Sequence, residues 1–338
     1  MGRALLGGLI WIPNVGRAES SLLLCFYYQV IIERRFHPRS SNLRVNPSRH
    51  LLSDVLAGSG FALFKLAYSS TARAWARIST SLRNNFPRFS HDGRKLALTK
   101  WRLETGADIW VADADGKNLT QLTTNSAHDY GPNWFPQDDR IAFLSNRGSN
   151  HGTLWSISPA IGKEELLLDL GESAAFAALS PNGEQVAFNS NKSGTINMWM
   201  VSLAGGGPKQ LTFSESGRVG FPCWSRDGQF LAFETAQGEE SYVTVMAASG
   251  GPSIQLTLDG QSFPYSWSPD GDKIAFAGER DGVWNVYWIS RSTKEQKRLT
   301  NYAQLNAFVR YPEWSPQGNE IVYEYAETTG NIWLMELK

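Results

Sequence analysis

A chain of 338 residues, 42% of them hydrophobic, is long enough to bury a substantial core in one large domain or two small ones. Its net charge is zero, but residues 1–85 hold eleven Arg or Lys against three acids, which leaves the remainder at −8. An acidic body argues against binding of a phosphate backbone, so we expect no nucleic acid contact through the main domain. Thirteen Trp and 31 Gly favour an all-β protein with many tight turns.

The first 58 residues contain neither a repeat nor a domain pattern of their own. One arginine precedes a short apolar run at 4–12, which is the form of a secretory signal peptide. We expect residues 1–58 to be a short, irregular, basic extension that is a signal, a disordered segment or wrongly assigned sequence. The start favours a periplasmic or other extracytoplasmic location, with the cytoplasm as the alternative. No run of 18 apolar residues occurs, so we expect no transmembrane span.

Residues 59–85 contain two short apolar segments, 64–68 and 74–78, that have the character of strands. They look like the second and third strands of the repeat that follows, with a shorter loop between them. We predict that this segment supplies a closing strand that docks on the sixth repeat. A partial seventh repeat is the alternative.

Copies of one short block recur through residues 86–338, and this repetition decides the architecture. The clearest copies read Phe-Pro-Cys-Trp-Ser-Arg-Asp-Gly at 221–228 and Ser-Trp-Ser-Pro-Asp-Gly at 266–271. Six copies are present, and their last positions lie 43 to 47 residues apart. In the second copy we expect Asp139 to replace the turn glycine. The other five copies end in Gly93, Gly183, Gly228, Gly271 and Gly318.

Each block predicts a tight hairpin, because Pro fixes φ, Asp bonds the backbone and Gly takes a positive φ. A second strand follows, as in Ile-Ala-Phe at 274–276, then a third, and then a fourth that ends in Leu-Thr, as at 256–257. In the sixth copy the chain ends after the third strand, at 331–335. One such sheet cannot bury both of its faces, so we predict radially stacked sheets. Four tryptophans are expected to pack between them: Trp134, Trp224, Trp267 and Trp314.

These blocks resemble the repeats of TolB-type β-propellers, a WD40-like (PD40) repeat. Its signature is Pro-x-Trp-Ser-Pro-Asp-Gly, then Ile-Ala-Phe and a Leu-Thr ending, and residues 267–276 match it best. The resemblance covers residues 86–338 and implies an all-β, six-bladed β-propeller of four-stranded antiparallel blades. The α/β domain that precedes the propeller in TolB itself does not match residues 1–58.

The sequence offers no catalytic or metal-binding motif. It has no Gly-x-Ser-x-Gly elbow and no phosphate-binding glycine motif. Cys25 and Cys223 lie in different segments, and we expect both to be unpaired, with Cys223 buried in a strand. We therefore expect no enzyme activity, no cofactor and no metal site. None of the five histidines has metal-ligand spacing: His37, His50, His91, His128 and His151.

We predict a monomeric scaffold for protein–protein interaction. In a propeller, the loops between the second and third strands and the connections between blades emerge on one face, which we call the loop face. Arginine and aromatic side chains commonly anchor protein interfaces. The loop face is therefore expected to bind a protein partner through exposed side chains of Arg218, Arg310, Tyr130, Tyr302 and Trp284.

Two alternatives remain open. The first is a small-ligand or metal-binding propeller, hydrolase-like or lyase-like, that uses the central channel. It requires the loops that carry His128 and His151 to converge. The second is a fragment of a larger regulator or peptidase whose partner domain is missing.

Overall fold

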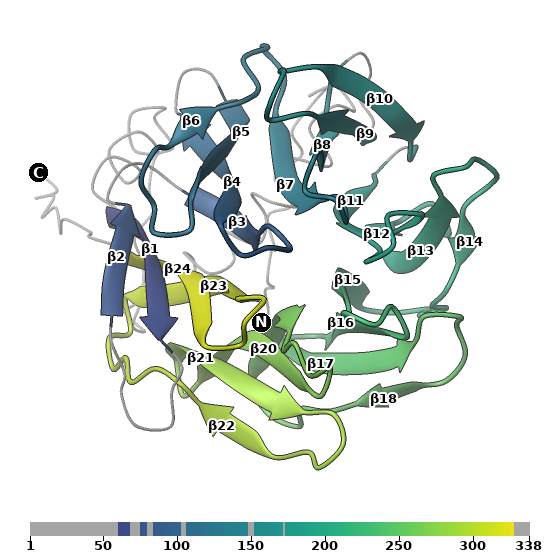
Figure 1. Ribbon diagram of the computed structural model, residues 1–338. Coiled ribbons are helices and arrows are strands. Elements are labelled where there is room, and N and C mark those ends of the chain that lie inside the picture. The colour runs from purple at the N-terminus through teal and green to yellow at the C-terminus, as the bar shows by residue number, and fades with distance from the viewer. Residues whose placement is uncertain are drawn as a thin grey trace, which may run out of the picture.

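The computed structural model describes residues 60–67, 75–79, 84–102, 106–147, 152–171 and 173–327. In these ranges every regular element is a strand, and the strands form six four-stranded sheets arranged around a central axis (Figure 1). The predicted all-β propeller of four-stranded antiparallel blades is therefore confirmed. Within the same ranges, no helix has the length and apolar character of a membrane span.

Five blades each consist of four consecutive strands, with the first strand nearest the axis (Figure 1). The first two blades contain β3 (Asn84–Phe89), β4 (Lys95–Arg102), β5 (Gly106–Asp113), β6 (Thr120–Gln121), β7 (Asp129–Trp134), β8 (Ile141–Ser145), β9 (Thr153–Ile157) and β10 (Glu164–Asp169). The third and fourth contain β11 (Ala175–Leu179), β12 (Gln185–Ser190), β13 (Asn197–Ser202), β14 (Lys209–Gln210), β15 (Arg218–Trp224), β16 (Phe230–Gln237), β17 (Glu240–Ala247) and β18 (Ser253–Gln255). The fifth contains β19 (Gln261–Trp267), β20 (Lys273–Arg280), β21 (Val283–Ser290) and β22 (Gln296–Arg298).

The sixth blade combines segments from both ends of the described chain. Its inner half is β23 (Ala307–Trp314) and β24 (Glu320–Glu327), and its outer half is β1 (Gly60–Ala67) and β2 (Trp75–Ser79). β1 pairs with β24 over its whole length, with Gly60 opposite Glu327 and Ala67 opposite Glu320. β1 thus occupies the third position of this sheet, for which the sequence predicted residues 331–335. Those residues lie outside the described ranges.

Five of the six hairpin turns are held by a serine at their start, and the second blade has Phe135 in that place. In the fourth blade, Ser225 Oγ donates to Asp227 Oδ1 at 2.5 Å and accepts the Phe230 N–H at 2.9 Å. The Gly228 N–H donates to the Ser225 carbonyl at 2.9 Å, which requires the chain to turn back sharply. The five turn glycines predicted from the sequence have φ between 69° and 76°, the left-handed conformation that favours glycine.

In the second blade the turn position belongs to Asp138, so the expectation that Asp139 replaces the glycine is wrong. Asp138 has a φ of 58°, and its N–H donates to the Phe135 carbonyl at 2.9 Å, as the glycine does in other blades. Its carboxylate also accepts the N–H groups of His91 and Asp92, at 2.8 and 3.0 Å. These bonds to the first blade's turn offset the cost of the left-handed conformation.

The Leu-Thr ending ties the fourth strand of a blade to the third. Thr257 Oγ1 accepts the Val243 N–H at 2.9 Å, and the Leu256 N–H donates to the Val243 carbonyl at 2.8 Å. Leu256 itself is buried in the cluster between the fourth and fifth blades. The threonine bond recurs in three other blades, at Thr123, Thr212 and Thr300.

Replacing Thr257 with valine should lower the free energy of unfolding by about 1–2 kcal/mol, because the buried Val243 N–H loses its acceptor. Urea denaturation of the full chain measures this loss. Thr124→Val is the matched control, because Thr124 is exposed and follows the Leu-Thr ending of the first blade. Equal losses in the two variants would show that the hydroxyl of Thr257 does not carry the stabilisation.

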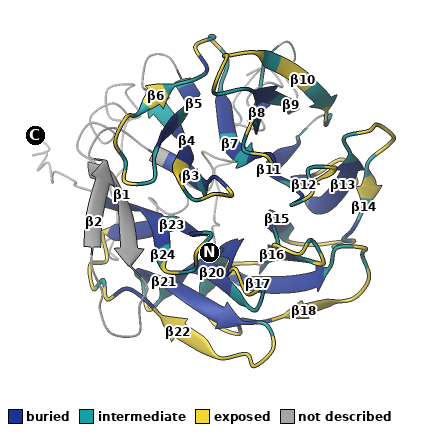
Figure 2. Cartoon of the chain, in the orientation of Figure 1, coloured by how far each residue is buried: buried dark blue, intermediate teal, exposed yellow. Residues whose placement is uncertain are grey.

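The core lies between the blades, where tryptophans near the ends of first strands link neighbours. Three of these indole N–H groups donate to a carbonyl of the preceding blade's first strand, at 3.0 to 3.1 Å. The inner strands are buried, whereas the outer strands β14, β18 and β22 are exposed (Figure 2). The predicted packing between blades is confirmed for the three donors and for Trp314, which is 2% exposed in the cluster that joins the fifth and sixth blades. The three donors are Trp134, Trp224 and Trp267.

Candidate binding site at the hairpin-turn end of the channel

The first strands of four blades hold an aromatic residue in the left-handed conformation. The φ angles lie between 48° and 54°, and the pairing register with the second strand shifts across each of these residues. A left-handed residue other than glycine costs about 1–2 kcal/mol, so the surrounding packing must hold it in place. The four residues are Phe86, Phe176, Phe221 and Tyr311.

These bulges bring the rings of neighbouring blades into contact around the axis of the propeller. Ring centroids lie 4.3 Å apart for Phe86 and Tyr311 and 4.2 Å apart for Phe176 and Phe221. Tyr265 of the fifth blade joins them, 5.4 Å from Tyr311. We call these five residues the aromatic plug. Because they come from five different blades, these rings gather at the inner edges of the blades and narrow the channel between its two ends.

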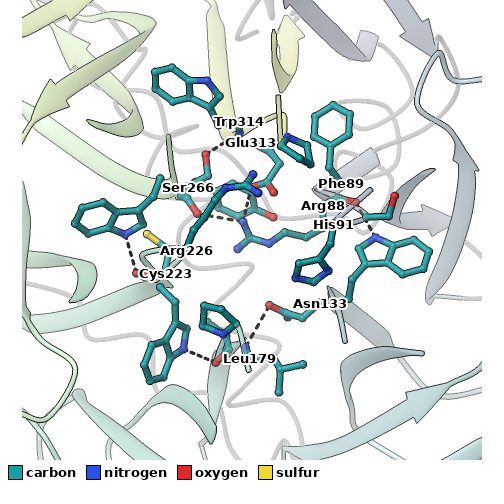
Figure 3. Close-up of a pocket in the computed structure, with 18 of the residues that line it drawn as sticks. Arg88, Phe89, His91, Asn133, Leu179, Cys223, Arg226, Ser266, Glu313 and Trp314 are labelled. Atoms are coloured by element: carbon teal, nitrogen blue, oxygen red, sulfur yellow. Dashed lines mark hydrogen bonds and ion pairs between the residues drawn. The ribbon is translucent and has the colours of Figure 1, made fainter. Parts of the chain in front are cut away.

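On the hairpin-turn side of the plug, the channel widens into a hollow of about 280 Å³, which we call the turn mouth (Figure 3). Its lining consists of the last residues of the first strands and the turns that follow them, and among the described residues no connection between blades contributes to it. The residues labelled in Figure 3 are Arg88, Phe89, His91, Asn133, Leu179, Cys223, Arg226, Ser266, Glu313 and Trp314.

An ion pair between Arg88 and Glu313 forms the floor of the turn mouth. Arg88 Nη1 lies 2.6 Å from Glu313 Oε2, and the two side chains are 17% and 11% exposed. The same nitrogen donates to the Tyr265 carbonyl at 3.1 Å, and the guanidinium carbon lies 3.8 Å from the centre of the Tyr265 ring. Arg88 therefore extends from the first blade to the fifth and sixth, and it covers the aromatic plug.

Burial has the largest effect on the pKa values of Glu313, Cys223 and Tyr265 around this floor. It raises the pKa of Glu313 above its ordinary value despite the nearby Arg88 charge. It also raises the pKa of the Cys223 thiol to about 12 and that of Tyr265 well above its usual value. Cys223 is buried and unpaired, as the sequence predicted. Neither the thiol nor the phenol is therefore a ready nucleophile or base at neutral pH.

Arg226 stands in the turn after β15 and points into the turn mouth (Figure 3). The residue is exposed, unlike Arg88. Glu313 attracts it electrostatically, and no described residue forms a hydrogen bond or an ion pair within 4.0 Å with its guanidinium. Arg226 therefore presents a charged donor group to anything that enters the hollow.

The two arginines predicted at the loop face lie at the other end of the channel, each paired within its own blade. Nη2 of Arg218 lies 2.9 Å from Oε1 of Glu234, and Nη2 of Arg310 lies 2.9 Å from Oε1 of Glu324. Both glutamates are almost fully buried. The arginine charges therefore balance buried carboxylates, which leaves them less available to a partner than the sequence suggested.

The aromatic residues predicted beside these arginines differ in exposure. Tyr130 and Trp284 are only 5% and 4% exposed, so the expectation that both are exposed anchors is wrong. They belong to the clusters between blades because their strands place them against neighbouring sheets. Trp284 and Arg310 together line a small cavity of about 40 Å³ next to the plug. Tyr302 is partly exposed, with its hydroxyl 2.9 Å from that of Tyr323.

His128 belongs to the junction between the first two blades. Its Nδ1 accepts the Ala107 N–H at 3.2 Å, and its ring lies 5.7 Å from that of Trp101. Burial lowers the pKa of His128. His151 lies outside the described residues, so convergence of the two histidine loops stays a prediction. Across the described ranges, no group of three or more His, Cys, Asp or Glu side chains is arranged to hold a metal.

The charged groups of the turn mouth, those of Arg88, Arg226 and Glu313, were not singled out from the sequence, although they lie inside the repeated blocks. Arg88 and Glu313 both occupy the position between proline and the aromatic residue, and Arg226 replaces the proline of Ser-Pro-Asp-Gly. The position after proline varies among the blades, while five of the six blocks keep the serine and the glycine of the turn. Positions that every blade needs in order to fold stay the same from repeat to repeat. A position that varies within an otherwise regular block was therefore the signal in the sequence that could have indicated these residues.

Comparisons with known proteins agree with this fold. A model of the family described as the TolB beta propeller domain (PD40) matches residues 161–332, about half of the chain. The TolB homologue of Protochlamydia amoebophila (strain UWE25) is 24% identical over 225 residues, which are 61% of this chain and 48% of that protein. The chain thus spans about half the length of this curated relative.

Solved structures show the same fold. The putative TolB of Agrobacterium tumefaciens aligns over 79% of this chain and 99% of its own, with a TM-score of 0.67 and 17% identity. TolB of Acinetobacter baumannii aligns over 81% of this chain and 74% of its own, with a TM-score of 0.62 and 18% identity. At these identities the likeness establishes the architecture and leaves the ligand open.

Proposed function

Because the chain belongs to the family of TolB β-propeller domains, we propose that it is a non-catalytic binding protein that receives a segment of a protein partner in its turn mouth. One observation carries the proposal. The turn mouth is a hollow open to solvent, with Arg88 and Glu313 at its floor and the guanidinium of Arg226, which has no bonded partner among the described residues, facing into it.

The walls of the turn mouth suit binding better than catalysis. The Asn133 amide donates to two backbone carbonyls, and Ser266 Oγ donates to the Pro312 carbonyl and accepts the Trp314 N–H, both at 2.8 Å. Most polar groups around the hollow are therefore held by the fold, and the wall is rigid. A rigid concave wall with few available polar groups supports recognition through shape and a small number of directed contacts.

The loop face predicted from the sequence is the second candidate surface for the same function. Arg218 is 29% exposed there, and Tyr302 is also accessible. The two surfaces lie at opposite ends of the first strands, because the hairpin turns and the connections between blades alternate along the chain. A partner bound at one end is therefore distinguishable from a partner bound at the other.

Photo-cross-linking in the host cell tests which end binds a protein. A photoreactive residue is placed at Pro181 or Pro316 in the turn mouth, or at the exposed Glu215 or Gln304 on the loop face. We expect a discrete protein adduct from the turn-mouth positions and none from the loop-face positions. The reverse pattern would move the site to the loop face, and no adduct from either end would contradict the protein-binding function.

The cross-linked cells can also be used to test the cellular location and the oligomeric state of the protein. We further propose that the protein works outside the cytoplasm as a monomer, supported by the signal-like start of the sequence and by membership of the TolB propeller family. Fractionation of the cross-linked cells should recover the adduct with extracytoplasmic proteins, and its mass should correspond to one copy of this chain plus the partner. Recovery with cytoplasmic proteins would overturn the proposed location.

A further inference from the structure

The charges in the wall of the turn mouth do not balance. Among the residues that line it, two arginines face one carboxylate, that of Glu313. Arg88 donates both of its hydrogen bonds to described groups from Nη1, and no described group accepts a hydrogen bond from its Nε or Nη2. Arg226 adds a second guanidinium with no bonded partner among the described residues. Donor N–H groups thus outnumber the acceptors that the fold supplies.

We infer that the turn mouth binds a carboxylate of the partner segment, held by Arg226 at the rim and by the open edge of Arg88 at the floor. This inference rests on the proposed function, because the carboxylate belongs to the bound protein segment. A guanidinium presents parallel N–H groups that match the two oxygens of a carboxylate, and such charge-assisted pairs are stronger than neutral hydrogen bonds.

The surroundings favour a single carboxylate over a polyanion. Glu313 already lies against Arg88, so a phosphate with two charges would meet more repulsion than a carboxylate with one. The hairpin turns around the mouth also carry exposed aspartates, including Asp92 and Asp227, which repel an extended phosphate backbone. A hollow of about 280 Å³ holds one or two side chains. The expected ligand is therefore an acidic side chain or a chain-terminal carboxylate.

A matched pair of small probes tests this inference on the full chain. The probes are N-acetylaspartate N′-methylamide and its asparagine counterpart, with binding followed by saturation-transfer NMR at about pH 7. We expect millimolar, saturable binding of the aspartate probe, about tenfold tighter than that of the asparagine probe. N-acetylglycine, with its terminal carboxylate, distinguishes the two sources of the charge. Equal binding of the aspartate and asparagine probes would overturn the inference.

Three substitutions should change the binding of the aspartate probe in three different ways. Arg226→Gln should remove the preference for aspartate, whereas Arg94→Gln should keep it, because Arg94 is 84% exposed on a neighbouring turn and does not line the hollow. Glu313→Gln should tighten binding several-fold, since it removes the competing charge and keeps a hydrogen-bonding side chain. A Glu313→Gln variant with weaker binding would contradict the carboxylate assignment.

Failure of the carboxylate assignment can be distinguished from failure of the proposed protein-binding function. If the turn-mouth adducts form with equal yield in the Arg226→Gln variant, and the probes show no charge preference, protein binding stands and the carboxylate assignment falls. If the aspartate probe binds as expected and no adduct forms at either end, the anion site stands without a protein partner. That second result would overturn the assignment of the carboxylate to a protein segment.

Discussion

Replacing Arg88 with methionine is expected to lower the free energy of unfolding by about 3–5 kcal/mol, because the change leaves Glu313 buried without its partner. The floor of the turn mouth joins three blades through Arg88, so the loss falls on the ring as a whole and not on one hairpin. Urea denaturation of the full chain, followed by tryptophan fluorescence, measures the change.

A double-mutant cycle separates the ion pair from the packing of the arginine stem. The Arg88→Met, Glu313→Met double variant should recover most of the lost stability, because two apolar side chains suit a site that faces the Tyr265 ring. Lys117→Met is the control, since Lys117 pairs with Asp115 on the exposed surface and should show no measurable effect. A loss below about 1 kcal/mol for Arg88→Met would mean that Glu313 remains well solvated.

The buried glutamate of the fourth blade should give the protein a dependence on pH. Burial raises the pKa of Glu234 from 4.5 to about 7, against the opposing effect of Arg218. A carboxyl whose pKa is raised by folding contributes its full stabilisation below the unfolded pKa and loses it as pH rises through the folded value. The contribution of Glu234 therefore declines between about pH 4.5 and pH 7, by roughly 2–3 kcal/mol in total.

Comparison of the native chain with the Glu234→Gln variant isolates this contribution, because other titrating groups are common to both. The stability advantage of the native chain should shrink by roughly 2–3 kcal/mol from about pH 5 to about pH 8. Glu215→Gln, on the exposed surface, is the matched control variant. An advantage that instead grows with pH would show that the pair with Arg218 outweighs burial.

Much of the fold could be predicted because its determinants are local. The bonds from Ser225 to Asp227 and Phe230 span at most five positions, so the block carries the complete chemistry of its turn. The one misplaced turn shows the limit of this approach. The second block offers two adjacent aspartates, and the bonds from Asp138 to the neighbouring blade identify the turn residue. Those bonds connect residues 46 and 47 positions apart, beyond the reach of a single block.

The candidate site was harder to predict because it exists only in the closed ring. Arg88 and Glu313 are 225 positions apart, and neither has a distinctive neighbour in its own block. Tyr130 and Trp284 illustrate the opposite error. Both lie near strand ends and have the composition of interface anchors, yet the neighbouring blade covers them. Burial against another blade depends on the stacking of sheets, which a pattern within one repeat does not contain.

The pairing of β1 with β24 also sets the order in which the molecule can be completed during synthesis. Among the described strands, β1 leaves the ribosome first and β24 last, whereas the five intervening blades need only their neighbours in order to stack. Until the last repeat emerges, the edge of β1 that will meet β24 has no strand from its own chain. An open edge of this kind is where two nascent chains on one messenger can exchange strands. Release of the final repeat is therefore the step that commits each chain to closing on itself.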